Sequence, residues 1–167
     1  KKLMDIDFVI TWVDMNDPEW KKSFAMAKGE IDNSRNQFSE ARFRDYGFLR
    51  YWFRGVEKFA PWVRKIHFVT CGQKPGWLDT SNPKLHLVSH KDYIPEQFLP
   101  TFNSTVLEFY LDRIPELSER FVYFNDDFYL TSPTGPDRFF SEDGLPNDIA
   151  AFRMNTGLSL WSKTLRN

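Results

Sequence analysis

IDFVITWVD (residues 6–14) and FVYFNDD (residues 121–127) are the two stretches that decide the fold. Each starts with a short run of apolar, β-branched and aromatic residues and ends in acidic ones. Runs of this composition predict strands that are buried on both faces, as in a parallel sheet. Both predicted strands therefore end in carboxylates.

Strands and helices alternate between these two stretches. Apolar residues at helical spacing predict a helix over residues 49–60, which Pro61 ends. Two further strands are predicted at residues 64–70 and 84–89. A second helix is predicted to begin near residue 105 and to carry its apolar face to about residue 114.

The polar segment at residues 19–40 is predicted to be a loop with at most one helical turn, inserted above the sheet. The second helix has a predicted capping box, because Thr105 and Glu108 have the required spacing. The order of elements predicts the α/β class: a mainly parallel sheet with helices on both faces. With 167 residues the chain is expected to form a single domain.

Composition excludes several classes of function. The net charge of −1, without a basic run, argues against a nucleic-acid partner. Cys71 is the one cysteine, so no intramolecular disulfide can form, which fits a reducing compartment. No apolar run is long enough to span a bilayer, so we expect a cytoplasmic protein.

Acidic residues follow the first and the last predicted strand. Ligands of open α/β sheets bind at the carboxyl ends of strands, where the strand order reverses. In a strand order of 3-2-1-4, Asp14 would face Asp126 and Asp127 across that crevice, and the three carboxylates would share one pocket. Such a site suits Mg²⁺ or Mn²⁺ bound to a diphosphate. Adjacent aspartates after a strand also fit an ordinary turn or cap.

Basic residues stand at the entrance of the first helix. Arg42, Arg44 and, further along, Arg50 form a candidate clamp for a diphosphate, because guanidinium groups bind phosphate oxygens in bidentate fashion. Asp45 beside them is a candidate general base. The alternative is a solvated helix start in which Asp45 complements the helix dipole.

Asn103, Ser104 and Thr105 offer polar groups at the start of the second helix, a potential site for an anion or a sugar hydroxyl. Helix capping explains the same three residues. The three histidines have no metal-ligand spacing and are expected to be structural or to lie on the surface.

Four segments together resemble the first two signature regions of the Stealth family, at residues 7–14, 42–79, 99–104 and 121–130. This family includes bacterial capsular polysaccharide phosphotransferases and the animal lysosomal-enzyme N-acetylglucosamine-1-phosphotransferase. The resemblance covers about residues 5–140. Further signature regions of the family have no counterpart after Phe140, so residues 1–167 are expected to form one partial catalytic domain.

The resemblance implies a nucleotide-diphospho-sugar transferase-like fold of the GT-A or Rossmann-like type. It implies transfer of hexose-1-phosphate, with N-acetylglucosamine-1-phosphate expected, from a UDP-sugar donor to a glycan acceptor with release of UMP. The expected setting is bacterial capsule or exopolysaccharide synthesis in the cytoplasm, with peripheral association at the inner face of the membrane.

The resemblance also implies roles for particular residues. Asp126 and Asp127 would hold the divalent metal on the diphosphate. Arg42 and Arg50 would stabilise charge on the transferred phosphoryl group, and Asp45 would accept or orient a proton. The nucleotide-sugar would be bound by Thr11, Trp12, Asp14, Asn103 and Ser104.

Two other functions share these features. A metal-dependent glycosyltransferase would use the same fold, metal and donor but would release UDP, because the bond broken lies at the anomeric carbon. A non-catalytic module would bind a nucleotide-sugar or a glycan without turnover. The released nucleotide distinguishes these three functions.

Overall fold

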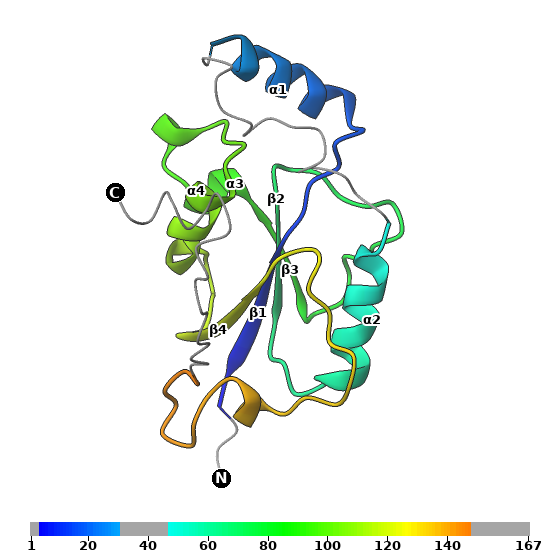
Figure 1. Cartoon of the computed structure of the whole chain (residues 1–167), viewed down its shortest axis with the longest axis vertical. Helices are drawn as coiled ribbons and strands as arrows, with labels where there is room; N and C mark the ends of the chain where they lie inside the picture. The colour runs from blue at the N-terminus through cyan, green and yellow to red at the C-terminus, as the bar shows by residue number, and fades with distance from the viewer. Residues whose placement is uncertain (1–3, 31–46, 148–167) are drawn as a thin grey trace, which may run out of the picture.

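A four-stranded, fully parallel sheet forms the centre of the molecule (Figure 1). The computed structural model describes residues 4–30 and 47–147. The strands are β1 (Ile6–Thr11), β2 (Ile66–Thr70), β3 (Leu85–Ser89) and β4 (Arg120–Phe124). The predicted α/β class is confirmed, and the spatial order β3-β2-β1-β4 is the one in which the first and the fourth strand are neighbours.

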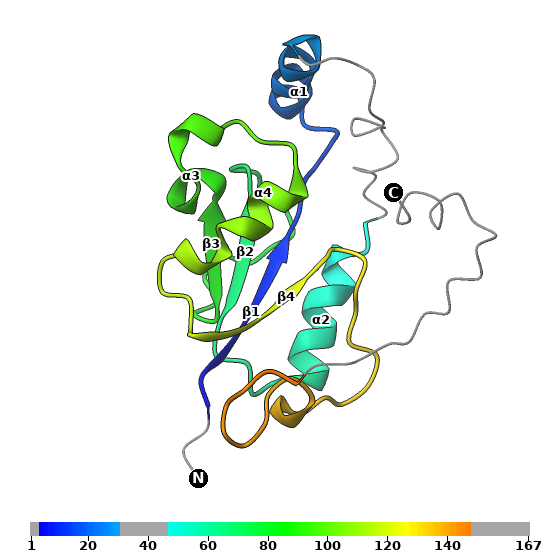
Figure 2. The same ribbon diagram turned by 60° about the vertical axis from the view of Figure 1, so that its left-hand side comes forward.

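Helices cover both faces of the sheet, as predicted (Figures 1 and 2). The helix α2 (Leu49–Phe59) lies on one face, and α3 (His90–Tyr93) and α4 (Ser104–Phe109) lie on the other. The short 3-10 helices are η3 (Glu96–Phe98), η4 (Leu111–Arg113) and η5 (Pro136–Arg138).

Alternate residues of the strands build two separate cores, because successive side chains of a strand point to opposite faces. Phe8 of β1 and Phe68 of β2 pack with Trp52 of α2 in the first core. Val9 and Val69, the next residue of each strand, pack in the second core, under α3, α4 and η4. The near-continuous apolar runs of the strands are explained by this burial on both faces.

The helix α1 (Pro18–Glu30) occupies the first part of the segment that was predicted to be a loop. That prediction is wrong. No sequence signal pointed to the helix, since α1 has no clear apolar stripe and, among its described side chains, a single buried one, Trp20. Asp17 caps α1 by accepting a hydrogen bond from the Trp20 N–H at 2.8 Å. Trp20 itself is buried and contacts Phe102, whose ring centroid is 5.7 Å away. The rest of the predicted loop lies outside the described residues.

The helix α4 is shorter than predicted and is capped two residues earlier. Asn103 is its N-cap, with the Asn103 Oδ1 accepting a hydrogen bond from the Thr105 N–H at 3.0 Å, so the predicted capping box was wrong. The helix ends at Phe109 because Tyr110 leaves helical geometry, with φ −108° and ψ 10°. Leu111 then reaches the second core through η4.

Asp7 of β1 is fully buried and joins several segments through its carboxylate. It accepts hydrogen bonds from the Arg64 guanidinium, from the Ser118 N–H at 2.8 Å and from the Lys65 N–H at 3.2 Å. His67 Nε2 lies 2.9 Å from Asp7 Oδ2. Burial alone would raise the pKa of Asp7, but the hydrogen bonds from His67, Arg64 and Ser118 outweigh it and hold the pKa below 3.8. Asp7 is therefore a buried anion that holds β1, β2 and the start of β4 together.

His67 and His86 are direct neighbours on β2 and β3, with their Nδ1 atoms 2.9 Å apart. One of these two nitrogens must donate and the other accept, so the contact holds one proton between them. Burial lowers the pKa of His86, and the neighbouring His67 adds to this effect. The sequence prediction of structural histidines is confirmed for this pair.

We expect Asp7→Asn to lower the free energy of unfolding by about 3 kcal/mol, because Arg64 and His67 would lose the buried charge that they face. The measurement is urea unfolding at pH 7. Glu119→Gln is the control, since its side chain is 88% exposed, and it should leave the midpoint unchanged. Equal midpoints for the wild type and Asp7→Asn would contradict the role of the buried anion.

Stability should also fall on mild acidification. An unfolded histidine takes up its proton near pH 6.5, whereas folded His86 does so only at lower pH, so the unfolded state binds more protons below pH 6.5 and is favoured. Unfolding measured between pH 7 and pH 5 should show this loss. His86→Asn keeps a polar partner for His67 without titrating and should give a shallower slope, whereas an unchanged slope would contradict the assignment.

Candidate functional site

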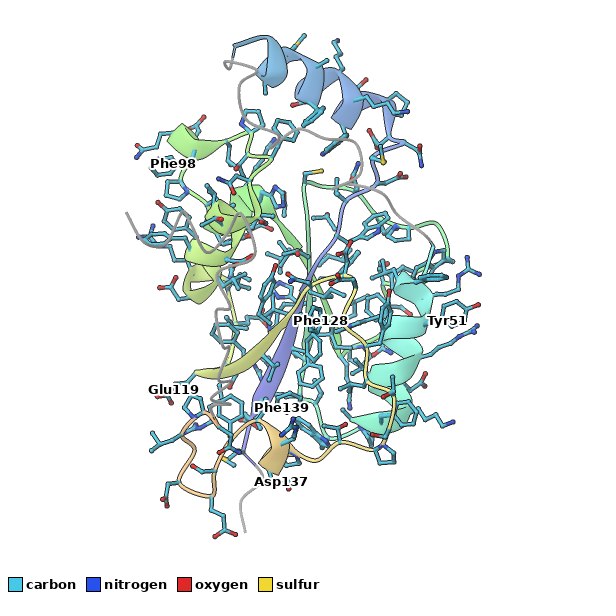
Figure 3. All side chains as sticks on the ribbon, viewed as in Figure 1. Tyr51, Phe98, Glu119, Phe128, Asp137 and Phe139 are labelled. Carbon is cyan, nitrogen blue, oxygen red and sulfur yellow. The ribbon has the colours of Figure 1, made fainter. Side chains whose placement is uncertain are left out.

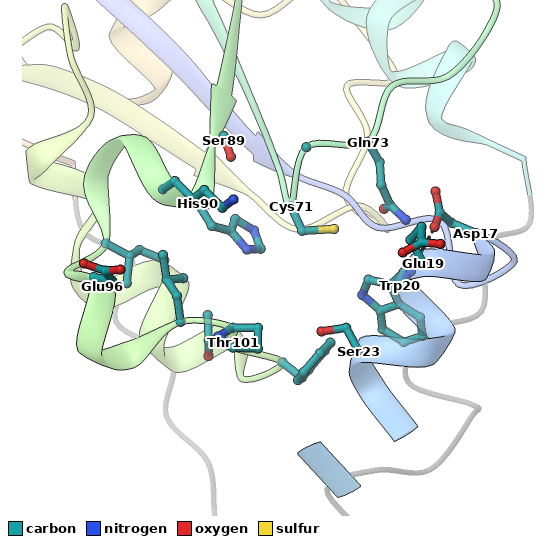
Figure 4. A pocket seen from close by; sticks show the side chains of 16 residues that line it. Asp17, Glu19, Trp20, Ser23, Cys71, Gln73, Ser89, His90, Glu96 and Thr101 are labelled. Carbon is teal, nitrogen blue, oxygen red and sulfur yellow. Dashed lines mark hydrogen bonds between the residues drawn. The ribbon is translucent and has the colours of Figure 1, made fainter. Parts of the chain in front are cut away.

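A pocket of about 830 Å³ opens at the carboxyl ends of β2 and β3 (Figure 4). One wall is the first turn of α1 with Trp20 and Ser23, and the opposite wall is the segment at residues 99–102. Cys71 and Gly72, which follow β2, line the pocket between these walls. The pocket lies at the carboxyl edge of the sheet but over β2 and β3, whereas the strand order reverses between β1 and β4.

Aromatic rings shape one side of this pocket. Trp20 stacks on Phe24 at 4.9 Å and meets Phe102 edge to face at 5.7 Å. Polar groups from Ser23 and Thr101 lie along the same walls. Polar and charged side chains line much of the rest of the pocket, including the carboxylates of Asp17, Glu19 and Glu96. A volume of this size is typical of small-molecule sites.

His90 lines the pocket at the end of β3, and its ring has no hydrogen-bond partner in the described part of the chain. Burial lowers the pKa of His90 to about 4, so the ring is neutral at pH 7. A neutral imidazole offers one donor and one acceptor to a ligand. Burial also raises the pKa of the Cys71 thiol, which keeps it protonated at pH 7 and unsuited to be a nucleophile.

Thr11, Trp12 and Asp14 come together at the end of β1, as predicted, but each has a structural contact. Thr11 Oγ1 lies 3.1 Å from the Tyr123 hydroxyl, and the Trp12 ring packs 5.8 Å from that of Phe68. The Asp14 carboxylate accepts the Asn16 N–H at 2.8 Å and so closes its own turn.

Gln73, in the loop after β2, holds that turn in place. Its side chain accepts a hydrogen bond from the Asp14 N–H and donates one to the Asp14 carbonyl, both at 2.8 Å. Gln73 also lines the pocket beside Asp17. Sequence reasoning missed Gln73, although its place just after a predicted strand was an available signal.

Asp126 and Asp127 lie exposed in a turn at the end of β4, directly beside β1 in the sheet. The Phe128 N–H donates to the Asn125 carbonyl at 3.2 Å, so the turn that was the alternative explanation is present. Within residues 4–30 and 47–147, no three Asp, Glu, His or Cys side chains are placed to hold a metal. The prediction that three carboxylates share one pocket is therefore wrong, because the Asp14 carboxylate is hydrogen-bonded within the turn after β1.

Asp126 and Asp127 remain as two adjacent exposed carboxylates. Mg²⁺ binds through one or two carboxylates and completes its shell with water and substrate phosphate. Asp126 and Asp127 offer such a pair on an exposed turn.

Three other predicted site residues belong to α2 and to α4 with its N-cap. Arg50 is exposed on the first turn of α2, with its guanidinium 5.8 Å from the centre of the Trp77 ring. Asn103 is engaged as the cap of α4, and Ser104 is exposed beside it. Arg42 and Asp45 lie outside the described residues.

Trp20, Ser23 and His90 are pocket residues that sequence reasoning did not single out as binding residues. Trp20 and Ser23 were hidden because their helix was predicted to be a loop. No helix in the described parts of the chain is long and apolar enough to cross a membrane.

Several curated proteins are similar to this chain over most of its length. The receptor polysaccharide phosphotransferase WefC of Streptococcus oralis is 52% identical over 92% of this chain and 45% of its own length. The exopolysaccharide phosphotransferase cps2G of Lactiplantibacillus plantarum is 49% identical over 87% of this chain and 42% of its own length. The capsular polysaccharide phosphotransferase eps5J of Streptococcus thermophilus is 42% identical over 97% of this chain and 68% of its own length.

The chain thus spans less than half the length of two of these relatives. Family models give the same assignment along the sequence. Stealth protein conserved region 1 matches residues 4–32, and Stealth protein conserved region 2 matches residues 42–148. On these matches, the chain belongs to the Stealth family.

Proposed function

We propose that the full-length protein transfers hexose-1-phosphate, with N-acetylglucosamine-1-phosphate as the expected group, from a UDP-sugar to a glycan hydroxyl and releases UMP. The observation that carries this proposal is the arrangement at the carboxyl edge of the sheet. A nucleoside-sized pocket lies over β2 and β3, and an exposed pair of carboxylates follows β4. The names of the relatives, which are polysaccharide phosphotransferases, support the reaction class.

In this proposal the pocket takes the nucleoside of the donor. The aromatic side formed by Trp20 and Phe102 suits a planar base, and the neutral His90 ring suits its polar edge. The β1 turn, held by Gln73, then leads from the pocket toward β4. The diphosphate would lie along this turn, past Thr11 and Asp14.

The acidic turn would hold Mg²⁺ or Mn²⁺ through Asp126 and Asp127. When bound, such a metal neutralises charge on the diphosphate. The rest of the chemistry depends on positioning and electrostatics, as in other phosphoryl transfers.

The transfer step forms one bond and breaks one. The oxygen of the acceptor hydroxyl attacks the phosphorus that carries the sugar, and the bond from that phosphorus to the bridging oxygen of UMP breaks. The hydroxyl proton passes to a base, for which Asp45 is the candidate, and UMP leaves with the bridging oxygen. Arg42 would stabilise the charge on the transferred group, whereas Arg50, whose guanidinium lies over the Trp77 ring, is not assigned to it.

The reaction consumes a nucleotide-sugar, which is made in the cytoplasm, and its product belongs to a surface polysaccharide. We therefore place the protein in the cytoplasm, in peripheral contact with the inner face of the membrane.

Replacing both acidic residues tests the reaction. Asp126→Asn with Asp127→Asn should lower UMP release by roughly 100-fold or more, because the charge on the diphosphate would lose its counterion. The measurement is chromatography of the nucleotides released from UDP-N-acetylglucosamine by the full-length protein with Mg²⁺ or Mn²⁺ and a glycan. Asp112→Asn, an exposed aspartate in η4, is the matched control and should keep wild-type rates. Release of UDP in place of UMP would move the protein to the glycosyltransferases.

Filling the pocket tests the assignment of the nucleoside site. Ser23→Trp would place a large ring in the pocket and should raise the KM for the donor by roughly 10-fold or more, with little effect on the fold. Met26→Trp is the control, because Met26 is on the same helix, is 61% exposed and does not line the pocket. The same donor KM in both variants would show that the nucleoside binds elsewhere.

A further inference from the structure

The outer side of α2 carries an unusual number of exposed rings. Leu49, Trp52 and Val56 face the core, whereas Phe48 and Tyr51 stand on the solvent side at 53% and 55% exposed. Figure 3 shows Tyr51 pointing away from the sheet. Trp77, in the loop after β2, is 44% exposed and lies beside the same helix, 6.1 Å from the ring of Phe53.

Two arginines lie between these rings and hold them. The Arg54 guanidinium is 5.7 Å from the centre of the Tyr51 ring, and that of Arg50 is 5.8 Å from the Trp77 ring. Phe48 meets Tyr51 edge to face at 6.3 Å. We name this surface, formed by Phe48, Arg50, Tyr51, Arg54 and Trp77, the aromatic ledge.

The aromatic ledge lies next to the carboxyl edge of the sheet. The helix α2 begins at that edge, and the ledge occupies its first turns (Figure 1). A Cβ placed on Gly55, one turn after Tyr51, would meet the Leu130 carbonyl at 3.2 Å. The flank of α2 near Tyr51 therefore faces the segment that follows the acidic turn. At the other flank, Trp77 belongs to the loop whose Gln73 holds the β1 turn.

We propose that the aromatic ledge binds the acceptor saccharide, with pyranose rings on Tyr51 and Trp77 and the guanidinium groups on the hydroxyls or acidic groups of the glycan. This inference rests on the proposed function for its identification of the saccharide as the acceptor. A pyranose ring has an apolar C–H face and a polar rim, so flat rings separated by donors match it.

The position of the ledge favours the acceptor over the donor. The nucleoside pocket lies over β2 and β3, whereas the Tyr51 flank of the ledge faces the segment after the acidic turn, where the phosphoryl group would be held. Trp77, at the other flank, belongs to the loop after β2 that also lines the pocket. A glycan lying across α2 from Trp77 to Tyr51 could bring a terminal hydroxyl to the phosphoryl group without occupying the pocket.

Two ring deletions test the ledge in the full-length protein. Tyr51→Ala and Trp77→Ala should each raise the KM for the acceptor by about 3- to 10-fold, the loss expected for one stacking contact. The acceptors are oligosaccharides prepared from the receptor polysaccharide of Streptococcus oralis. The KM for UDP-N-acetylglucosamine should stay at the wild-type value. Phe109→Ala, which removes a 75% exposed ring from α4, is the matched control.

Direct binding separates this inference from the proposed function. The same oligosaccharides are titrated into the protein without donor, and wild type and control should bind saturably whereas the two ledge variants bind more weakly. Three results would refute the assignment of the ledge to the acceptor: equal binding by all four proteins, no binding by the wild type, or a larger effect of the variants on the donor KM than on the acceptor KM. Saturable binding that depends on the ledge, with no UMP released from any UDP-sugar, would instead leave the ledge as a saccharide site and refute the proposed function.

Discussion

The buried carboxylate of Asp7 is the constraint on which the rest of the sheet depends. It is the shared acceptor for groups from the segment before β2, from β2 itself and from the segment before β4. A buried charge of this kind is satisfied in one arrangement only, because a shift of any of these segments would leave it without donors. It lies near the amino end of β1 and so sets the register of the strands whose opposite ends carry the site.

Because the register is fixed, the strand ends form different parts of the carboxyl edge. The ends of β2 and β3 with α1 form the pocket, the end of β1 forms a turn held by Gln73, and the end of β4 forms the acidic turn. The helices α2 and α4 pack in the two cores, against the faces of the sheet, and therefore do not cover its carboxyl edge. The edge stays open to a ligand that extends from β3 to β4 and beyond it to α2.

The sequence predicted the sheet well because its signal is strong and local. Apolar runs such as residues 6–13 leave little choice of structure, and the alternation with helices predicted a mainly parallel sheet. The helix α1 was missed because two of its rings, Trp20 and Phe24, anchor it through contacts with Phe102, which is distant in the sequence. No local pattern reports such a contact. The helix α4 was predicted too long for the opposite reason, since Leu111 keeps helical spacing although it reaches the core through η4.

The candidate site was predicted only in outline. The rule that ligands bind at strand ends directed the prediction to the carboxyl edge of the sheet, where Asp126 and Asp127 lie exposed and where the pocket opens. It did not reveal that Asp14 would use its carboxylate to close a turn, because the sequence alone fixes no side-chain direction. His90 was noted in the sequence and expected to be structural or on the surface, since only the folded chain shows its ring desolvated in a pocket.

The register of β1 has a consequence for how the chain folds. Phe8 pairs with Ile66 on one side and with Val122 on the other, so the central strand has no partner close to it in the sequence. Its neighbours must be brought together across long loops before any contact compensates the lost chain entropy, which makes folding slow. During synthesis, β1 would leave the ribosome before β4, and its apolar residues would stay unpaired on that side until the segment that carries β4 has emerged. The pairing of β1 with β4 is therefore a late event, and until then the apolar residues of β1 favour aggregation of the nascent chain.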